Sequence, residues 1–202
     1  LLNQPDDPLE RSHNVRFGFG AGVEPDLHAV FEERFGFPLI EVWGMTEMCR
    51  VLAANNEPRK RGTRAMGKPV PGLDVQVRDE DDQTVPAGEV GEMVVRFSAA
   101  TPRLGAFSGY LKDQVATEEA WRGGWFHTGD SVRQAEDGML HFVDRKKNII
   151  RRSGENIAAA EVEAVLQTHD AVTQVAVLAV PDSTREEEVL ACIVAAPGSE
   201  TG

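Results

Sequence analysis

Apolar and polar residues follow one another in a strand, helix, strand order near the start of the chain. Residues 15–19 form a short apolar run that leads into the glycine-rich segment 18–22. Pro25 suits the first turn of a helix, and Gly36 suits its end. Residues 39–42 are the next strand. The predicted apolar face of the helix consists of Leu27, Val30, Phe31 and Phe35. This order predicts a βαβ-type unit with a ligand-accessible turn at its strand ends.

The middle of the chain shows the period of half-buried strands. Leu73, Val75 and Val77 alternate with polar residues, and residues 91–97 form another strand-like run. The acidic residues 79–83 between them indicate a solvated turn. Short strands separated by Gly and Pro predict a small antiparallel sheet or barrel.

The last part of the chain predicts a second, α+β unit. Residues 139–143 form a strand-like run that precedes the basic segment. Past that segment, a helix begins near Ala159 with an apolar face of Val162, Val165 and Leu166. Two β-rich runs, 172–180 and 189–195, are joined by a loop at 181–188. About 55 residues is a size at which a hydrophobic core is marginal.

A basic, polar joint at residues 142–156 separates these foldable parts. Two interpretations remain open for it: a hinge that offers cations to an anion, or a solvated linker between domains.

The amino-acid composition narrows the range of possible functions and partners. The chain has 202 residues, 41% of them hydrophobic, and a net charge of −12, so it can bury a core but repels nucleic acid and anionic membrane. No apolar run approaches the roughly 20 residues that cross a bilayer. Cys49 and Cys192 lie far apart without metal-ligand spacing, which favours a reducing, cytoplasmic setting. Because the chain begins at Leu1 and stops just after a strand-like run, we expect a fragment of a longer protein.

Three segments carry candidate chemistry. The glycines at 18–22 allow close backbone approach to a ligand, although on this pattern alone a tight structural turn is the favoured explanation. In residues 41–47, Trp43 can stack on a base, Thr46 can bind phosphate, and Glu47 can hold Mg²⁺. The alternative places Trp43 in the core and Glu47 in solvent.

The third segment is residues 125–130. Asp130 follows a predicted glycine turn and can accept both hydroxyls of a ribose; alternatively, its side chain closes the turn. His127 lies beside aromatic residues and is assigned no catalytic role.

Taken together, residues 43–47, 91–95, 125–130 and 144–163 resemble, in order and spacing, the later core motifs of the adenylate-forming superfamily. This superfamily includes acyl-CoA synthetases, peptide-synthetase adenylation domains and luciferases. The amino-acid sequence of the predicted hinge, residues 145–163, is most similar to the acyl-CoA ligase branch, including ligases of the crotonobetaine/carnitine type.

The resemblance implies a mixed α/β and α+β fold: the end of a βαβ layer, a small antiparallel β subdomain, then the start of a small α+β C-terminal domain. Residues 1–146 would belong to the large adenylate-binding domain, with the βαβ unit to about 55 and the β subdomain at about 64–145. Residues 147–202 would form the hinge and a truncated C-terminal domain.

The resemblance also implies an activity and a set of site residues. The reaction would be ATP-dependent formation of an acyl adenylate from a small carboxylic acid, followed by thioester formation with CoA. In that scheme Thr46 would contact phosphate, Glu47 would hold Mg²⁺, and Asp130 with Arg145 would bind the ribose. Lys147 would be the pivot of the domain rotation, Gly154 would let the pantetheine arm of CoA pass, and Asn156 would reach phosphate in the adenylating state. The adenine wall would consist of Gly20, Ala21, Gly22, Glu41, Val42 and Trp43.

Departures from the family pattern qualify these assignments. Trp43 stands where the family usually has Tyr, and Asn156 is shorter than the usual Gln or Arg. The family's phosphate loop would lie before Leu1 and its C-terminal Lys beyond Gly202, so we expect this chain alone to be inactive. Two alternatives stay open: an enzyme that loads a carrier protein, and a non-catalytic nucleotide-binding domain.

Overall fold

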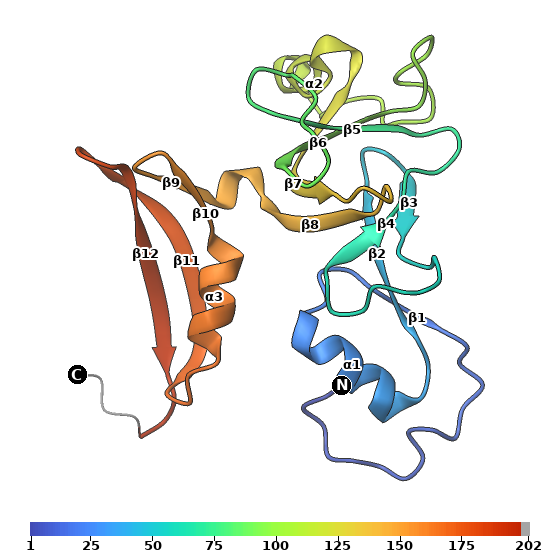
Figure 1. The fold of residues 1–202 in the computed structure, drawn as a ribbon, viewed down its shortest axis with the longest axis vertical. Coiled ribbons are helices and arrows are strands. Elements are labelled where there is room, and N and C mark those ends of the chain that lie inside the picture. Colours follow the sequence, from blue (N-terminus) through green and yellow to red (C-terminus); the bar gives the residue numbers. More distant parts are fainter. Residues whose placement is uncertain (199–202) are drawn as a thin grey trace. The chain divides into compact units, whose positions relative to one another are not determined.

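The computed structural model describes residues 1–198, which divide into two compact units. Unit 1 comprises Leu1–Thr128 and Val132–Phe142, and unit 2 comprises Gly129–Ser131 and the chain from Val143 onward. The elements, drawn in Figure 1, are β1 (Gly18–Gly20), α1 (Pro25–Phe35), β2 (Leu39–Met45), β3 (Arg50–Ala53), β4 (Ala65–Gly67), β5 (Asp74–Arg78), β6 (Val90–Arg96), α2 (Gln114–Ala120), the 3-10 helix η1 (Arg122–Gly124), β7 (Phe126–Gln134), β8 (Leu140–Arg145), the 3-10 helix η2 (Lys146–Asn148), β9 (Ile149–Arg152), β10 (Glu155–Ala158), α3 (Ala159–Gln167), β11 (Val172–Asp182) and β12 (Glu186–Ala195).

The first sheet of unit 1 has the order β1-β2-β3, and β1 runs parallel to β2 with α1 between them in sequence. The predicted strand, helix, strand unit is therefore present. The predicted helix face is wrong in part, because Leu27 and Val30 are about half exposed, whereas His28 and Phe35 are buried. His28 takes an inward position because its Nε2 lies 2.7 Å from the carbonyl oxygen of Leu39, which satisfies polar groups on both elements.

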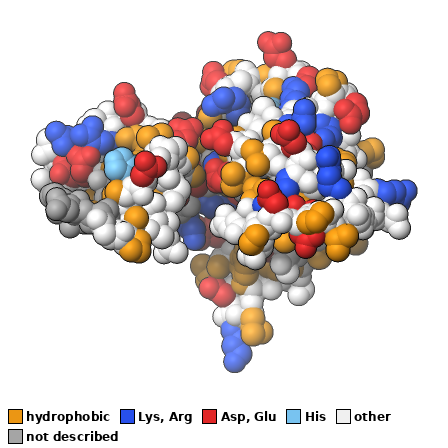
Figure 2. All heavy atoms as spheres, turned by 90° about the horizontal axis from the view of Figure 1, so that it is seen from below, with side chains coloured by type: hydrophobic (Ala, Val, Ile, Leu, Met, Phe, Trp, Pro, Cys, Tyr) orange, Lys and Arg blue, Asp and Glu red, His pale blue; other side chains and the backbone are white. Residues whose placement is uncertain are grey.

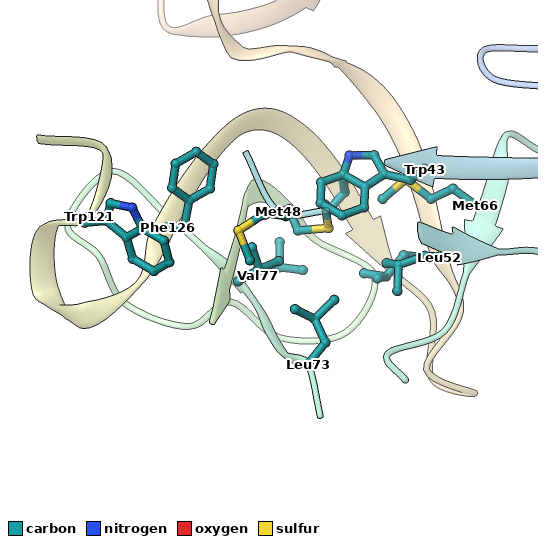
Figure 3. Close-up of a cluster of buried hydrophobic side chains, with 12 residues drawn as sticks. Trp43, Met48, Leu52, Met66, Leu73, Val77, Trp121 and Phe126 are labelled. Carbon is teal, nitrogen blue, oxygen red and sulfur yellow. The ribbon is translucent and has the colours of Figure 1, made fainter. Parts of the chain in front are cut away.

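The second sheet of unit 1 has the order β4-β8-β7-β6-β5. Leu73 and Val77 are buried and Val75 is half-buried, as the alternating pattern predicts. Side chains from this sheet, from the residue before β5, from the end of α2, from β2 and β3, and from the turn between β2 and β3 form one hydrophobic cluster (Figure 3). Its buried members are Trp43, Met48, Leu52, Met66, Leu73, Val77, Met93, Val95, Trp121, Phe126, Val132 and Leu140.

Unit 2 contains a four-stranded sheet of order β10-β9-β12-β11, with α3 packed on β11. Its core is small and centres on Ile150, Ala159 and Val177. Val162 and Leu166 pack against this core, but Val165 is 70% exposed, so the predicted helix face is wrong at that position. The predicted loop at 181–188 is also too long, because β11 and β12 stay paired as far as Asp182 and Glu186.

These sheets and helices confirm the predicted mixed α/β and α+β fold class. On the face drawn in Figure 2, acidic and basic side chains are interspersed. Within residues 1–198, no helix is both long and apolar enough to cross a membrane.

Candidate active site

The glycine turn after β1 and the carboxylate of Glu41 lie together in unit 1. Gly20 and Glu41 are paired positions of the parallel strands β1 and β2, and a Cβ on Gly20 would collide with the side chain of Val23. The Val23 N–H donates a 3.3 Å hydrogen bond to Glu41 Oε1. Ala21 and Gly22 are exposed beside this turn. Burial raises the pKa of Glu41 to about 7, because a low-polarity site disfavours the charged carboxylate.

Trp43 follows Glu41 on β2 and belongs to the core. It is 7% exposed and lies within the hydrophobic cluster, where Figure 3 shows its ring near Met66 and Met48. Val42, which lies between Glu41 and Trp43, is half-buried and pairs with Ala53 of β3. The structure therefore agrees with the alternative interpretation of Trp43, in which its indole is part of the hydrophobic core.

Thr46 and Glu47 stand on the tight turn between β2 and β3. The N–H groups of Met48 and Cys49 both donate to the Met45 carbonyl at 3.2 Å, and the fully buried Met48 side chain anchors the turn in the cluster. Thr46 is exposed and Glu47 is half-buried. The turn thus presents a hydroxyl and a carboxylate on a rigidly anchored backbone.

The carboxylate of Glu47 is held from a distant part of the chain. The Tyr110 hydroxyl donates to Glu47 Oε1 at 3.2 Å, and the Phe107 N–H donates to the Glu47 carbonyl at 2.7 Å. Glu47 is therefore not the freely solvated side chain of the alternative interpretation. The sequence pattern carried no signal for Tyr110, because 63 residues separate it from Glu47.

The oxygen ligands at this turn suit a Mg²⁺ ion that is also bound by the phosphates of a substrate. Among residues 1–198, no group of three or more His, Cys, Asp or Glu side chains is arranged to hold a metal ion. Mg²⁺ commonly keeps several waters and binds through one or two carboxylates together with substrate phosphates. A single carboxylate at Glu47 suits a cation that arrives with a nucleotide, and does not suit a cage built from protein ligands alone.

Asp130 and Arg145, predicted to act together, are in contact in unit 2. Arg145 Nε lies 2.9 Å from Asp130 Oδ1; the Asp130 side chain is 3% exposed and that of Arg145 is 48% exposed. A carboxylate buried to this extent needs such a partner, because an unpaired buried charge is costly. The pair therefore forms a fixed polar position with one solvent-accessible end.

The local structure around Asp130 differs from the prediction. Residues 126–134 form the continuous strand β7, so the predicted glycine turn is wrong. Gly129 has a φ of +70° inside this strand, which a side chain would strain. The alternation that would reveal the strand is weak because β7 lies between β6 and β8 and is buried on both faces. His127 is buried, with Nδ1 3.2 Å from Glu92 Oε2.

The basic segment after β8 is folded rather than a solvated linker. Residues 149–152 and 155–158 pair as the hairpin β9–β10, and Ile150 is fully buried. The buried Asp144 carboxylate accepts hydrogen bonds from Arg145 N at 2.7 Å, Asn148 Nδ2 at 3.2 Å and Ala160 N at 3.0 Å. Sequence reasoning overlooked Asp144, which joins η2 to the first turn of α3.

Cations gather in a pocket of unit 2. Its volume is about 1020 Å³. The lining residues are Gly129, Arg145, Lys146, Lys147, Asn148, Ile149, Arg151 and Glu187. Such a concentration of Lys and Arg favours an anionic ligand. The pocket brings Arg145 and Lys147 together, two of the residues singled out from the sequence.

Gly154 and Asn156 lie on the β9–β10 hairpin. Gly154 has a φ of +81°, and a Cβ built on it meets no atom within 4 Å. Glycine is therefore favoured here by the backbone conformation itself, and a ligand's need for space would be additional. Asn156 is exposed on β10 opposite Arg151.

Comparison with known proteins places these features in a family. The family profile described as AMP-binding enzyme matches residues 1–111, and the profile described as AMP-binding enzyme C-terminal domain matches residues 161–201. A crotonobetaine/carnitine–CoA ligase from Proteus mirabilis is 36% identical over 200 residues, which is 98% of this chain and 38% of the relative. The chain thus spans about two fifths of the length of the curated relatives it matches.

Solved structures of similar proteins support the same family assignment. An amide bond synthetase from Marinactinospora thermotolerans superposes with a TM-score of 0.75 at 33% identity, covering 98% of this chain and 41% of that one. The o-succinylbenzoate CoA synthetase of Bacillus subtilis, in complex with its acyl-adenylate intermediate, gives 0.76 at 28% identity over 92% of this chain and 37% of that one. The chain therefore belongs to the AMP-binding enzyme family of adenylate-forming ligases.

Proposed function

We propose that this chain is part of an ATP-dependent acyl-CoA ligase. A carboxylate would attack ATP to give an acyl adenylate and pyrophosphate, and the CoA thiol would then displace AMP to give a thioester. The observation that carries the proposal is the Asp130–Arg145 pair beside the cation-lined pocket, in a chain similar to proteins named as CoA ligases. Residues 1–146 would supply part of the large adenylate-binding domain, and residues 147–202 the hinge and part of the C-terminal domain.

The two-step reaction follows from the chemistry of carboxylates. A carboxylate is a poor electrophile because its oxygen is a poor leaving group, and joining it to AMP provides a good one. The protein must therefore hold the nucleoside and its phosphates in fixed positions while charge develops. Asp130, oriented by Arg145, would accept the ribose hydroxyls, and the Gly20–Gly22 turn with Glu41 and Val42 would form the adenine wall, supported from behind by Trp43.

Thr46 and Glu47 would act at the phosphates. The exposed Thr46 hydroxyl would donate to a phosphate oxygen, and Glu47 would hold Mg²⁺. Held by Glu47, Mg²⁺ would supply charge neutralisation at the phosphates, which would favour attack at phosphorus.

The segment after β8 would serve the second step. Lys147 would be the pivot about which the C-terminal domain turns, and Asn156 would contact phosphate in the adenylating pose. Gly154 would allow the pantetheine arm of CoA to pass close to the backbone. A rotation of this kind also shields a reactive adenylate from water.

The decisive experiment uses the full-length protein with ATP, Mg²⁺, CoA and a pool of carboxylic acids, analysed by mass spectrometry. An acyl-CoA product is expected, and its mass names the acid. Acyl adenylate without acyl-CoA would shift the proposal to another acceptor, such as a carrier protein. Nucleotide binding without any product would favour a non-catalytic domain of the same fold.

A second candidate is amide formation, in which an amine replaces the CoA thiol. It is favoured by the amide bond synthetase, which matches 98% of this chain at an identity close to that of the CoA ligase relative. Both reactions share the adenylate. Adding a pool of amines to the assay separates them, because an amide that forms in preference to acyl-CoA would identify the amine as the acceptor.

The role of Asp130 has its own test. Asp130→Asn keeps the size of the side chain and removes the charge paired with Arg145, and it should weaken AMP binding by about 1–3 kcal/mol. Asp137→Asn is the matched control, because Asp137 also pairs with a cation, Lys60, but lies on an exposed turn. Calorimetric titration with AMP measures both variants. Equal affinities for AMP in the two variants would remove Asp130 from the ribose site.

A further inference from the structure

Tyr110 is the single tyrosine of the chain, and its hydroxyl reaches the proposed metal-binding carboxylate. The phenol oxygen lies 3.2 Å from Glu47 Oε1, and a phenol beside a carboxylate donates the hydrogen bond. The two residues come from the turn after β2 and from the loop before α2. This contact joins two parts of unit 1 that the sequence leaves far apart.

The phenol is held in place by several contacts. The Tyr110 N–H donates to Thr117 Oγ1 at 2.9 Å, and Thr117 is buried. The Phe107 ring packs edge-on against Tyr110, with centroids 4.9 Å apart, and against Phe126 of the core, at 5.8 Å. Tyr110 therefore approaches Glu47 from a fixed platform.

The same platform holds the Glu47 backbone. The Phe107 N–H donates to the Glu47 carbonyl at 2.7 Å, so the loop binds both the main chain and the side chain of this one residue. A glutamate on an open turn samples several rotamers, and ordering it costs up to about 2 kcal/mol of side-chain entropy. The Tyr110 hydroxyl restricts the Glu47 side chain before the ligand binds, so less side-chain entropy is lost on binding.

We propose that Tyr110 is a positioning residue that orients the Glu47 carboxylate for the divalent cation carried by the nucleotide. The inference rests on the proposed function, in which Glu47 holds that cation. Tyr110 itself touches neither cation nor nucleotide in this scheme and acts through Glu47.

The test compares the full-length protein with its Tyr110→Phe variant, which removes one oxygen atom and keeps the ring packing. Mn²⁺, a paramagnetic substitute for Mg²⁺, is titrated in the presence of a non-hydrolysable ATP analogue and followed by electron paramagnetic resonance. Loss of one partly solvent-exposed hydrogen bond predicts a Kd for Mn²⁺ about 5- to 10-fold higher. Leu111→Ala is the matched control, because Leu111 is the next residue and is 91% exposed.

A kinetic measurement separates positioning from general stability. In pyrophosphate exchange, Tyr110→Phe should need about 5- to 10-fold more Mg²⁺ for half-maximal rate, while the rate at saturating Mg²⁺ changes little. Unchanged dependence on Mg²⁺ and Mn²⁺ in this variant overturns the inference, whatever its melting temperature.

A double-mutant cycle keeps the inference testable if either variant is less stable. Tyr110→Phe should have little effect on Mn²⁺ affinity when Glu47 is already Gln, because the two residues act through one contact. If the two substitutions have additive effects on Mn²⁺ affinity, the positioning role of Tyr110 is overturned, and the proposed function is unaffected. If the unmodified protein neither binds the Mn²⁺-analogue complex nor forms an acyl adenylate, the proposed function fails, and this inference fails with it.

Discussion

The two segments proposed to meet the nucleotide are anchored by different proportions of apolar contacts and hydrogen bonds. The turn at Thr46 and Glu47 in unit 1 is anchored mainly by Met48 and Trp43, which lie inside a cluster of twelve buried residues, and hydrogen bonds from Phe107 and Tyr110 add to this at Glu47. Residues 144–156 in unit 2 lie beside a core of three buried residues and are fixed by the carboxylate of Asp144. The turn in unit 1 therefore depends mainly on burial, and the segment in unit 2 mainly on a few directional hydrogen bonds.

The difference has physical consequences. Apolar contacts are non-directional, so a cluster can hold a turn without fixing each polar atom on it. Hydrogen bonds to a buried carboxylate fix particular atoms, and losing the acceptor leaves several donors unsatisfied at once. A small unit with a marginal core gains positional definition from such a group.

The largest expected effect is in the core of unit 1. Leu52→Ala should lower the free energy of unfolding by about 4 kcal/mol, because Leu52 is fully buried and the variant leaves a cavity. Urea unfolding followed by fluorescence reports this unit, since Trp43, Trp121 and Trp125 all lie in it. Val51→Ala is the control on the same strand: Val51 is 58% exposed, and its loss should cost less than about 0.5 kcal/mol.

Asp144→Ala should have the next largest effect, about 3 kcal/mol, confined to unit 2. Hydrogen exchange should show lost protection at the N–H of Ala160, which donates to Asp144 at 3.0 Å. Asp182→Ala is the comparison, because its carboxylate also accepts backbone N–H groups, those of Thr184 and Arg185, but in an exposed turn. Similar losses for the two variants would contradict the special role of the buried carboxylate.

Glu41 predicts a pH dependence in unit 1. Its pKa is raised by burial from 4.5 to about 7; the hydrogen bond from the Val23 N–H and the charge of Arg64 oppose the shift, and Glu24 adds to it. The folded carboxyl keeps its proton up to about pH 7, whereas the unfolded chain releases it near 4.5, so stability falls as the pH rises through this window. Glu41→Gln cannot ionise. Its stability relative to the parent should rise by about 2 kcal/mol between pH 5 and pH 8 in urea unfolding.

Glu32 is the control for the sign of this effect. Burial acts to raise its pKa, but hydrogen bonds from Arg59 and from the Leu39 N–H prevail and lower it to about 2. Its contribution to stability should be complete above pH 4.5 and lost as the pH falls toward 2. Glu32→Gln should therefore show the opposite pH trend, and a trend of the same sign in both variants would refute the assignment.

The smallest effect concerns the β9–β10 hairpin. Gly154→Ala should cost about 1 kcal/mol in stability, because an L side chain is strained at a positive φ although the added Cβ meets nothing. Gly123→Ala is a matched control, with a φ of +64° and equally open space. Only the Gly154 variant should raise the KM for CoA. If both variants leave that KM unchanged, the hairpin does not face the pantetheine arm.

Several features could be predicted from local pattern. Pro25 and Gly36 bound a helix, and Leu73 and Val77 mark a half-buried strand, because such signals act over a few residues. Predictions failed where another element decides which face is buried. Val165 satisfies the helical period of α3 and is nonetheless exposed, and residues 126–134 are a strand with too little alternation to reveal it.

The sequence by itself determined the fold class and the family, because ordered motifs and short-range periodicity are present along the chain, and it supplied the candidate site residues as predictions. Only the tertiary structure decided that Trp43 is core, that Asp130 meets Arg145, that Asp144 collects three donors, and that Tyr110 reaches Glu47. The physical reason is that hydrogen bonds and burial depend on distances in space. Chain separations such as the 63 residues between Glu47 and Tyr110 carry no such information.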